Sequence, residues 1–309
     1  MGKLVIVGTV AFDAIETPFG KTDKILGGAA TYIGFSAANF DNVDAAAVSV
    51  VGGDFPQEYL DLLTERKVSI EGVEIIKNGK TFFWSGKYHN DMNSRDTLVT
   101  ELNVLENFNP VVPESYRDSE VVMLGNLHPA VQQGVLNQMT KKPKLAILDT
   151  MNFWMDIAMD DLKAVIKNVD VITINDEEAR QLSGEYSLVV AAKKIHKMGP
   201  KFVVIKKGEH GALLFHNDNM FYAPALPLEE VFDPTGAGDT FAGGFAGYLA
   251  KTSDFSFENM KRAVIYGSTL ASFCVEKFGT ERMQNLTDKE IYKRLGQFKS
   301  LTQFDIELN

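Results

Sequence analysis

The residue types and spacing best suited to chemistry occur in the segment 233–240, which reads DPTGAGDT. Gly236, Ala237 and Gly238 carry little or no side chain, so a ligand can approach their backbone closely. Apolar residues recur every four positions from Phe241 onward, which predicts a helix that begins at this segment. The open N–H groups and the positive dipole end of a helix N-terminus stabilise an anion such as phosphate. These three small residues are therefore predicted to form an anion hole.

Asp239 directly follows the small residues and would lie in the first turn of that helix. A phosphate bound at the same helix end would repel a carboxylate, so an acid here needs a further reason. The sharper interpretation is that Asp239 accepts a proton from an alcohol that attacks the phosphate, as a general base does. The alternative is an ordinary capped helix, because acids are favoured in a first turn.

Three motifs occur in order along nearly the whole chain. Residues 27–32 read GGAATY, residues 175–178 read NDEE and residues 233–245 read DPTGAGDTFAGGF. They resemble, in turn, the Gly-Gly element, the Asn-x-x-Glu and the D-T-x-G-A-G-D signature of the ribokinase/PfkB-type carbohydrate kinase family. Many members of that family have Asn at the position of Tyr32, so the identity of the sugar does not carry over.

The resemblance implies an ATP-dependent kinase that transfers the γ-phosphoryl group of ATP to a hydroxymethyl group of a sugar or sugar-like alcohol, with Asp239 as the base. Two alternatives stay open at this stage. One is a nucleoside kinase of the same fold, in which Trp84 and Tyr88 could stack on a base. The other is a non-catalytic module that binds a sugar or a nucleotide. A binding module has no need of a base beside its phosphate site, which favours the kinase.

Substrate-binding residues are expected where strands end, because ligands of open α/β sheets bind outside the carboxyl ends of the strands. Asp13 lies shortly after the first predicted strand, and the family has an Asp at the equivalent place that binds substrate hydroxyls. Gly27 and Gly28 would allow close approach of the sugar. Asn126 and Asn152 follow two later strands and are further candidate contacts.

By similarity to the family, the nucleotide is expected along the turn at residues 206–211. Lys206 could meet a phosphate, while Gly208 and Gly211 could permit close approach of ATP to the backbone. The alternative is a plain β-hairpin whose lysines face solvent.

Two cation sites are also implied by the resemblance. Asn175 and Glu178 would organise Mg²⁺ and the phosphates, largely through water, which Mg²⁺ retains in such sites. An Asn followed three residues later by an acid is also a capping box, and that alternative stays open. Asp233 and the loop at 276–280 lie where many relatives hold a monovalent cation.

The elements that position these residues are predicted to form one ribokinase-like α/β domain over residues 1–309, with a doubly wound, mostly parallel sheet. Short continuous apolar runs are typical of strands buried on both faces of such a sheet. Strands are expected at 4–7, 45–51, 121–124, 145–148, 171–174, 202–205 and 212–215, and helices at 29–40, 55–67, 130–140 and 257–275. By similarity to the family, residues at about 12–20 and 81–105 form a small β-sheet lid.

Composition limits the remaining classes. The net charge of −10 argues against broad nucleic-acid binding. No apolar run is long enough for a membrane helix, and the N-terminus lacks a signal-peptide pattern, so a cytoplasmic enzyme is expected. The single cysteine, Cys274, excludes an internal disulfide and a cysteine-based zinc site. A homodimer formed through the lid is a further expectation from the family.

Overall fold

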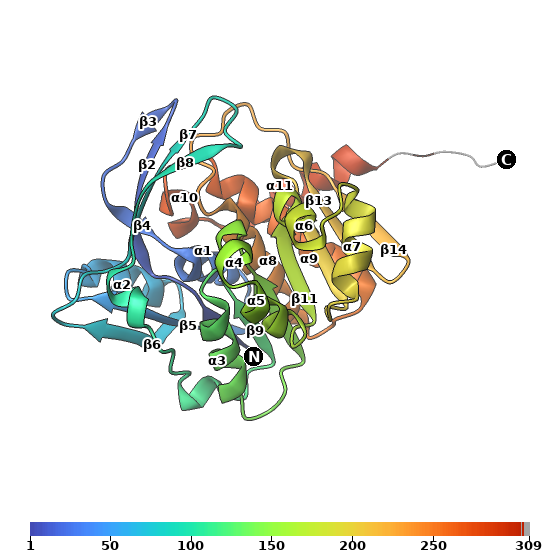
Figure 1. Cartoon of the computed structure of the whole chain (residues 1–309). Coiled ribbons are helices and arrows are strands. Elements are labelled where there is room, and N and C mark those ends of the chain that lie inside the picture. The colour runs from blue at the N-terminus through green and yellow to red at the C-terminus, as the bar shows by residue number, and fades with distance from the viewer. Residues whose placement is uncertain (304, 306–309) are drawn as a thin grey trace.

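The computed structural model of the chain describes residues 1–303 and 305. Within these residues the largest element is a nine-stranded sheet (Figure 1). From one edge to the other, its strands are β14 (Asn219–Ala223), β13 (Ala212–His216), β12 (Phe202–Lys206), β11 (Val171–Asn175), β10 (Leu145–Asp149), β9 (Val121–Leu124), β1 (Gly2–Val7), β5 (Val43–Gly52) and β6 (Val68–Ile76).

Neighbouring strands from β12 to β6 run parallel, and the β12–β13 and β13–β14 pairs are antiparallel. This confirms the mostly parallel sheet that the apolar runs predict. The sequence analysis does not predict the edge strands β6 and β14. Both are largely half-buried or exposed, so they lack the continuous apolar run of a strand that is buried on both faces.

Helices cover both faces of the sheet, so the fold is doubly wound. Alternate residues of a strand point to opposite faces, and in β1 Leu4 and Ile6 join one core cluster whereas Val5 and Val7 join the other. On the first face lie α1 (Ala29–Ala37), α2 (Gln57–Glu65), α8 (Ala237–Thr252), α9 (Phe257–Cys274), α10 (Glu281–Gln284) and α11 (Asp288–Thr302). On the second face lie α3 (Pro129–Gln138), α4 (Asn152–Ile157), α5 (Met159–Ile166), α6 (Asp176–Ser183) and α7 (Leu188–His196).

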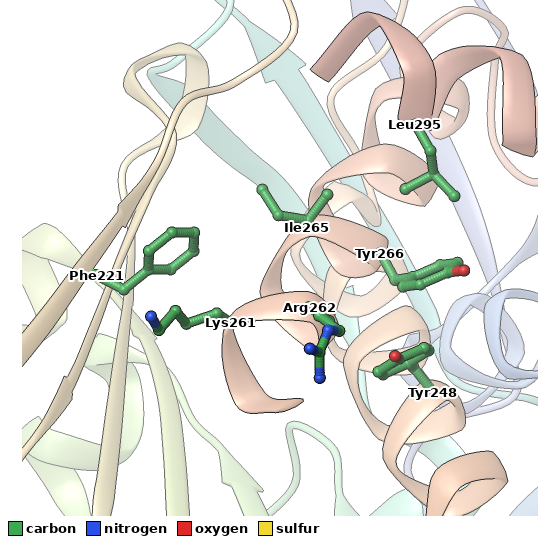
Figure 2. A pocket seen from close by; sticks show the side chains of 7 residues that line it. All are labelled: Phe221, Tyr248, Lys261, Arg262, Ile265, Tyr266 and Leu295. Atoms are coloured by element: carbon green, nitrogen blue, oxygen red, sulfur yellow. The ribbon is translucent and has the colours of Figure 1, made fainter. Parts of the chain in front are cut away.

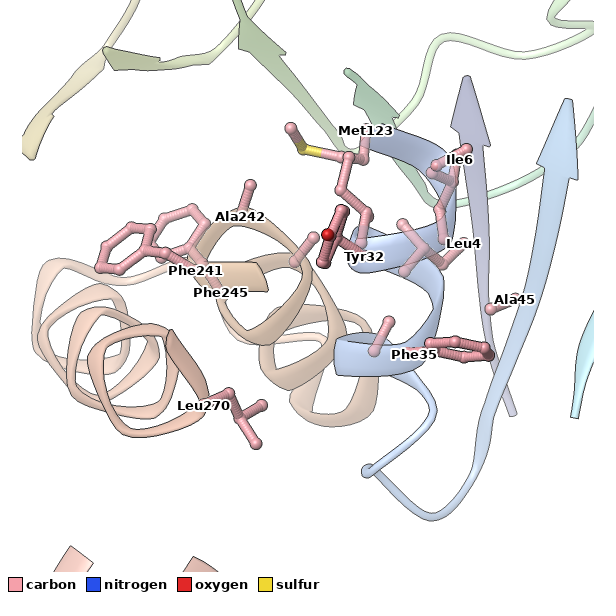
Figure 3. Packing of buried hydrophobic residues seen from close by; sticks show 14 of the residues in the cluster. Leu4, Ile6, Tyr32, Phe35, Ala45, Met123, Phe241, Ala242, Phe245 and Leu270 are labelled. Carbon is pink, nitrogen blue, oxygen red and sulfur yellow. The ribbon is translucent and has the colours of Figure 1, made fainter. Parts of the chain in front are cut away.

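Helix α8 packs closely against α1, and this contact fixes where its N-terminus lies. A Cβ atom on Gly243 would lie 2.3 Å from the backbone oxygen of Ile33. A larger residue would therefore force the two helices apart. Figure 3 shows side chains of both helices, among them Tyr32 and Ala242, packed over β1.

A second, smaller sheet stands beside the main one and corresponds to the expected lid (Figure 1). It consists of β3 (Gly20–Lys21), β2 (Ala11–Thr17), β7 (Phe83–Tyr88) and β8 (Arg95–Glu101), in that order, with β4 (Ile25–Gly27) paired to β2. Most of these strands fall within residues 12–20 and 81–105. We call this sheet the lid below.

The underside of the lid faces the N-terminus of α8. In the β2–β7 pair Asp13 stands opposite Trp84, and residues that are opposite each other in register point to the same face. Tyr88 lies on the same face, four residues further along β7, and its hydroxyl is 3.1 Å from Thr235 Oγ1 in the segment before α8. Asp13, Trp84 and Tyr88 therefore line the space between the lid and the main sheet.

The composition led to two expectations, one about membrane-spanning helices and one about Cys274. None of the helices among residues 1–303 combines the length and the hydrophobicity that crossing a bilayer requires. Cys274 is buried and forms no disulfide. It packs in the core cluster below α8 as a small apolar residue.

Candidate active site

The N-terminus of α8 forms at the segment that the sequence singles out. Gly236 precedes the first turn, and its φ of 73° lies in the left-handed region that favours glycine. A Cβ atom there would lie 2.4 Å from the ring of Tyr32, so a side chain does not fit without a shift. Helix α8 then starts at Ala237 and has Asp239 in its first turn.

The three N–H groups of the predicted anion hole are not equivalent. The N–H of Ala237 donates to the backbone oxygen of Pro234 at 3.2 Å. Within the described chain, the N–H groups of Gly236 and Gly238 donate to no protein acceptor. Of these three donors, the two open ones therefore belong to the glycines, and among the described residues the N–H of Asp239 that follows them is open as well.

One lysine and three carboxylates meet beside this helix end. Lys206, the last residue of β12, has its Nζ 2.9 Å from Oδ2 of Asp149, the last residue of β10. A Cβ atom on Gly238 would lie 3.3 Å from the same Nζ, so the ammonium sits at the start of α8. Burial acts to lower the pKa of Lys206, but the charges of Asp149, Glu178 and Asp239 raise it overall. The lysine therefore stays positively charged.

Two carboxyl groups of this cluster have a pKa near neutrality. Burial, and after it the charge of Asp149, raises the pKa of Asp239 to about 7, while Lys206 and Arg95 act in the opposite direction. Burial likewise raises the pKa of Glu178 to about 7, against the charge of Lys206. A base with a pKa close to the working pH is suited to take up a proton during catalysis.

Asp13 is buried where the lid meets the main sheet. Burial raises its pKa to about 7, the N–H of Gly28 lowers it, and the charges of Asp233 and Asp239 raise it further. A Cβ atom on Gly27 would lie 2.0 Å from Asp13 Oδ2. The predicted Gly-Gly element therefore makes room for this carboxylate, a role that the sequence analysis did not foresee.

Asn175 and Glu178 form the capping box of α6. Asn175 Oδ1 accepts the N–H of Glu178 at 2.8 Å, and Glu178 Oε2 accepts the N–H of Asn175 at 2.8 Å. Among the described residues, none donates a hydrogen bond to Glu178 Oε1, and the charge of Lys206 acts on this carboxylate. Among residues 1–303 and 305, no three His, Cys, Asp or Glu side chains are placed to hold a metal ion by themselves.

The turn after Lys206 joins the antiparallel strands β12 and β13. Its backbone is therefore the β-hairpin that the sequence analysis considered as the alternative to a nucleotide-binding turn. Gly208 and Gly211 have φ values of 54° and 83°, both in the left-handed region. Contrary to that alternative, Lys206 does not face solvent, because its side chain is only 16% exposed. Asn93, from the loop at the tip of the lid, has its Nδ2 3.4 Å from Glu209 Oε1, so the lid reaches this turn.

Asn126 and Asn152 lie at strand ends as predicted, but their amides already have protein partners. Asn126 Oδ1 accepts the indole N–H of Trp154 at 2.8 Å, and its Nδ2 contacts Met151 Sδ at 3.0 Å. The Nδ2 of Asn152 donates to Gln181 Oε1. Either side chain would have to exchange these partners to bind a substrate.

Asp233 ties two segments together. Its Oδ1 accepts the N–H of Thr235 and its Oδ2 accepts the N–H of Gly279, both at 2.8 Å. The side chain is fully buried. The carboxylate therefore anchors the 276–280 loop to the segment before α8.

Sequence reasoning missed the role of Asp149. The residue directly follows the predicted strand 145–148, and a polar residue at the end of a buried strand was the available signal. Its partner Lys206 is 57 residues away in sequence. Their contact depends on the order β12-β11-β10 in the sheet, which no local pattern encodes.

A separate groove of about 390 Å³ lies between β14 and the helices α8, α9 and α11 (Figure 2). Tyr248 of its lining is nine residues beyond Asp239, which corresponds to roughly 14 Å along the helix. The groove is therefore remote from the cluster at the start of α8. It is lined by Phe221, Tyr248, Lys261, Arg262, Ile265, Tyr266 and Leu295.

Comparison with known proteins decides the family. The model of the pfkB family of carbohydrate kinases matches residues 1–287. The chain belongs to the pfkB family. Among its relatives, a cytidine kinase of Thermococcus kodakarensis is 35% identical over 255 residues, which cover 80% of this chain and 89% of that protein. A nucleoside kinase of Methanothermobacter thermautotrophicus is 25% identical and covers 90% of this chain and 91% of its own length.

The solved structures agree on the fold of this pfkB-family protein. The nucleoside kinase of Methanocaldococcus jannaschii, a member of the ribokinase family, superimposes with a TM-score of 0.76 at 20% identity, over 96% of this chain and 99% of that one. The fold is therefore ribokinase-like, as predicted. The family and its kinase relatives make this protein an ATP-dependent kinase of a sugar or a nucleoside, which confirms the kinase interpretation over the non-catalytic module.

Proposed function

We propose that this pfkB-family kinase phosphorylates the 5′-hydroxymethyl group of a ribonucleoside, and that cytidine is the first acceptor to test. Sugars and nucleosides both fall within the family, so the proposal narrows the acceptor class. It rests on the aromatic wall that Trp84 forms on the underside of the lid, in register with Asp13. The 35% identity to a cytidine kinase supports it.

The indole of Trp84 is placed so that a flat ring could stack on it. A Cβ atom on Gly86 would lie 2.2 Å from Trp84 Cη2, so the indole lies across its own strand over a glycine. The guanidinium of Arg95 is 5.8 Å from the ring centroid. A nucleobase stacks favourably on such an aromatic surface, whereas a free pentose has no π-face to offer. Tyr88, the second aromatic residue considered for this task, uses its hydroxyl to contact Thr235 instead.

In this proposal the ribose lies between Asp13 and Asp239. The buried Asp13 carboxylate accepts hydrogen bonds from the ribose hydroxyls, which favours its charged form. Asp239 accepts the proton of the 5′-hydroxyl as the oxygen attacks the γ-phosphorus of ATP and the bond to ADP breaks. The N–H groups of Gly236 and Gly238 donate to the transferring group.

Positive charge for the phosphates comes from two elements. Lys206 supplies an ammonium at the start of α8, and Arg95 is carried by the lid. The charge of Arg95 acts on both Asp239 and Glu178, so a closed lid brings a cation to the reaction centre. With Gly208 and Gly211 in the turn beyond, the nucleotide would extend from Lys206 along residues 206–211.

Mg²⁺ is part of the proposal. Glu178 would hold the hydrated ion through its Oε1, with Asn175 orienting Glu178 through the capping box; the bound ion neutralises phosphate charge. The proposal does not include a monovalent cation, and the role it gives Asp233 is to tie the 276–280 loop to the segment before α8 through one backbone N–H on each carboxylate oxygen.

The acceptor class is tested by ADP release with cytidine, uridine, adenosine, inosine, ribose and fructose at fixed ATP and Mg²⁺. Asp239→Asn, purified in parallel, controls for a contaminating kinase. We expect the highest kcat/KM with a nucleoside, and with cytidine among these. A kcat/KM for ribose or fructose that is tenfold above that of every nucleoside would reject the nucleoside proposal and leave the family assignment unchanged.

The outer edge of the lid supports the proposal of a homodimer. Strand β8 is exposed along its whole length and has no neighbour beyond it among the described strands. Leu98 and Val99 are 53% and 39% exposed there, and an unpaired edge of this kind is a template for pairing. Light scattering on the wild type and on Leu98→Lys tests this, and we expect the variant to be monomeric.

The cytoplasm, where ATP is supplied, is the compartment in which we propose that the enzyme acts.

A further inference from the structure

We propose that Asp149 is a positioning residue that holds the ammonium of Lys206 at the start of α8 and keeps it from pairing with Asp239. This inference rests on the proposed role of Asp239 as the base, but not on which acceptor the enzyme uses. Asp149 itself would touch neither the alcohol nor the transferring phosphoryl group.

Asp149 is built as a fixed anchor. Its Oδ2 binds Lys206 Nζ at 2.9 Å, and its Oδ1 accepts the N–H of Thr150 at 2.9 Å. Its backbone oxygen accepts the side-chain amide of Gln132 at 3.0 Å. The two side chains of the ion pair are only 7% and 16% exposed. Strand β10 and its neighbours therefore hold the carboxylate of Asp149 in place. The position of the longer, more flexible side chain of Lys206 is then set by its bond to this carboxylate.

An anchor is needed because the ammonium lies in an unfavourable place. It is beside Gly238, at the positive end of the α8 dipole, where a cation is disfavoured until phosphate arrives. Without Asp149, the ammonium would be shared between the two remaining carboxylates whose charges act on it, Glu178 on α6 and Asp239 on the same helix end. A base that forms such an ion pair is a weaker base, because its charged form is stabilised.

Among the described residues, Lys206 is the cation of the main sheet whose charge acts on Asp239. The charged or titratable groups that face it are Asp149 on β10, Lys206 on β12, Arg95 on β8, Asp13 on β2 and Cys274 on α9. Of these, Lys206 and Arg95 are the cations, and Arg95 belongs to the lid. By holding Lys206 Nζ at 2.9 Å, Asp149 therefore keeps the cation of the main sheet from moving toward Asp239.

The test compares Asp149→Asn with Asp170→Asn. Asp170 forms a matched ion pair with Lys201, also at 2.9 Å, at the opposite end of the same strands. In Asp149→Asn the negative charge that raises the pKa of Asp239 is gone and Lys206 is free to approach, so both effects lower that pKa from about 7. We expect the acid limb of kcat/KM to move to lower pH by about one unit, kcat to fall, and KM for ATP to rise about tenfold. Asp170→Asn should change none of these.

Asp149→Glu keeps the charge but moves it by one methylene. This variant is the second test of the inference and can be used if Asp149→Asn does not fold. We expect an acid limb close to that of the wild type together with a raised KM for ATP, because the ammonium is displaced. A purely structural ion pair predicts another result: lower thermal stability with unchanged acid limb and unchanged KM for ATP in every Asp149 variant that folds. That result overturns the inference. The measurements use whichever acceptor the wild type phosphorylates, so failure of the nucleoside proposal does not affect them.

Discussion

The hydroxyl of Tyr88, on the lid, lies 3.1 Å from Thr235 Oγ1, in the segment that leads into α8. The two residues are 147 positions apart in sequence, and their contact joins the lid to the segment before α8. Burial raises the pKa of Tyr88 to about 12, so the phenol stays neutral at physiological pH. The contact therefore works as a neutral hydrogen bond that stabilises the lid in this position.

Tyr88→Phe should weaken lid closure without affecting the fold. A neutral hydrogen bond is worth about 0.5–1.5 kcal/mol net, so we expect KM for the acceptor to rise by roughly two- to tenfold. Steady-state kinetics measure this, with Tyr116→Phe as the control, since Tyr116 contacts Asp44 on the far side of the main sheet. Equal KM values for Tyr88→Phe and the wild type would show that the contact does not hold the lid.

Asp239→Asn should abolish most of the activity and leave the protein folded. A positioned general base contributes roughly 10²–10⁴ to the rate, and we expect kcat to fall by that factor. Asn is nearly the same size as Asp, so the circular dichroism spectrum should not change. Turnover at the wild-type rate in this variant would remove Asp239 from the mechanism.

The stability of the protein should depend on pH in the opposite direction to its activity. The pKa of Asp239 is raised to about 7 in the folded protein from 3.8, so between these values the folded state binds more protons than the unfolded state. The free energy of unfolding therefore falls as the pH rises through about 7. We expect activity to rise over the same range, because Asp239 can act in its proposed role as the base only after it has lost its proton.

Asp239→Asn removes this contribution, while most other carboxylates titrate alike in both proteins and the charge of Asp239 is the smallest of the causes that act on Asp13. We expect the wild type to lose more stability than the variant between pH 5 and pH 8, by roughly 1–3 kcal/mol, given about 1.36 kcal/mol per pKa unit. Urea unfolding at both pH values gives the four free energies. Parallel losses in the two proteins would mean that the pKa of Asp239 is not raised by folding.

Gly238→Val should impair ATP binding. The Cβ position is 3.3 Å from Lys206 Nζ, so a branched side chain would displace the ammonium and cover an open N–H donor. We expect KM for ATP to rise about tenfold or more, which corresponds to about 1.4 kcal/mol. Gly296→Val in α11 is a matched control, because a Cβ atom there meets nothing within 4 Å. Unchanged nucleotide affinity in Gly238→Val would contradict the anion-site model.

Trp84→Ala should lower the activity toward nucleosides much more than the activity toward sugars. Stacking of a base on an aromatic side chain is worth about 1–3 kcal/mol, so we expect kcat/KM for the preferred nucleoside to fall by roughly 5- to 150-fold. Trp84→Phe keeps an aromatic face and should lose much less. The activity toward ribose, where it is measurable, should change little in either variant. A loss that is the same for ribose and for the nucleoside would mean that Trp84 supports the lid rather than the base.

Local patterns in the sequence were sufficient for the start of α8. Small residues at 236–238 followed by apolar residues at helical spacing require a tight turn into a helix, and this is a property of neighbouring residues. The buried strands were predictable for a similar reason, because a strand covered on both faces must be apolar throughout. The edge strands β6 and β14 escaped prediction because their exposed faces leave no such pattern.

Asn126 and Asn152 show the limit of reasoning from strand ends. Their positions were predicted correctly, but a sequence does not tell which neighbours a side chain will meet. Trp154 and Gln181 come from the helices on the second face and Met151 directly precedes one of them, and their contacts with the two amides depend on how those helices pack. Glu178 shows the same limit. Its capping box with Asn175 involves neighbouring residues and was predictable, whereas its proximity to Lys206 depends on the tertiary structure.

The sequence by itself determined the family and the place where α8 begins, at which we propose the phosphate site and the base, because these follow from residue types at fixed short spacings. Only the tertiary structure decided which charges surround that base. The order of strands in the sheet brings Lys206 to Asp149, and the pairing of β2 with β7 puts Trp84 beside Asp13. Contacts between residues so far apart in sequence depend on how whole elements pack, and that information is spread over the entire chain.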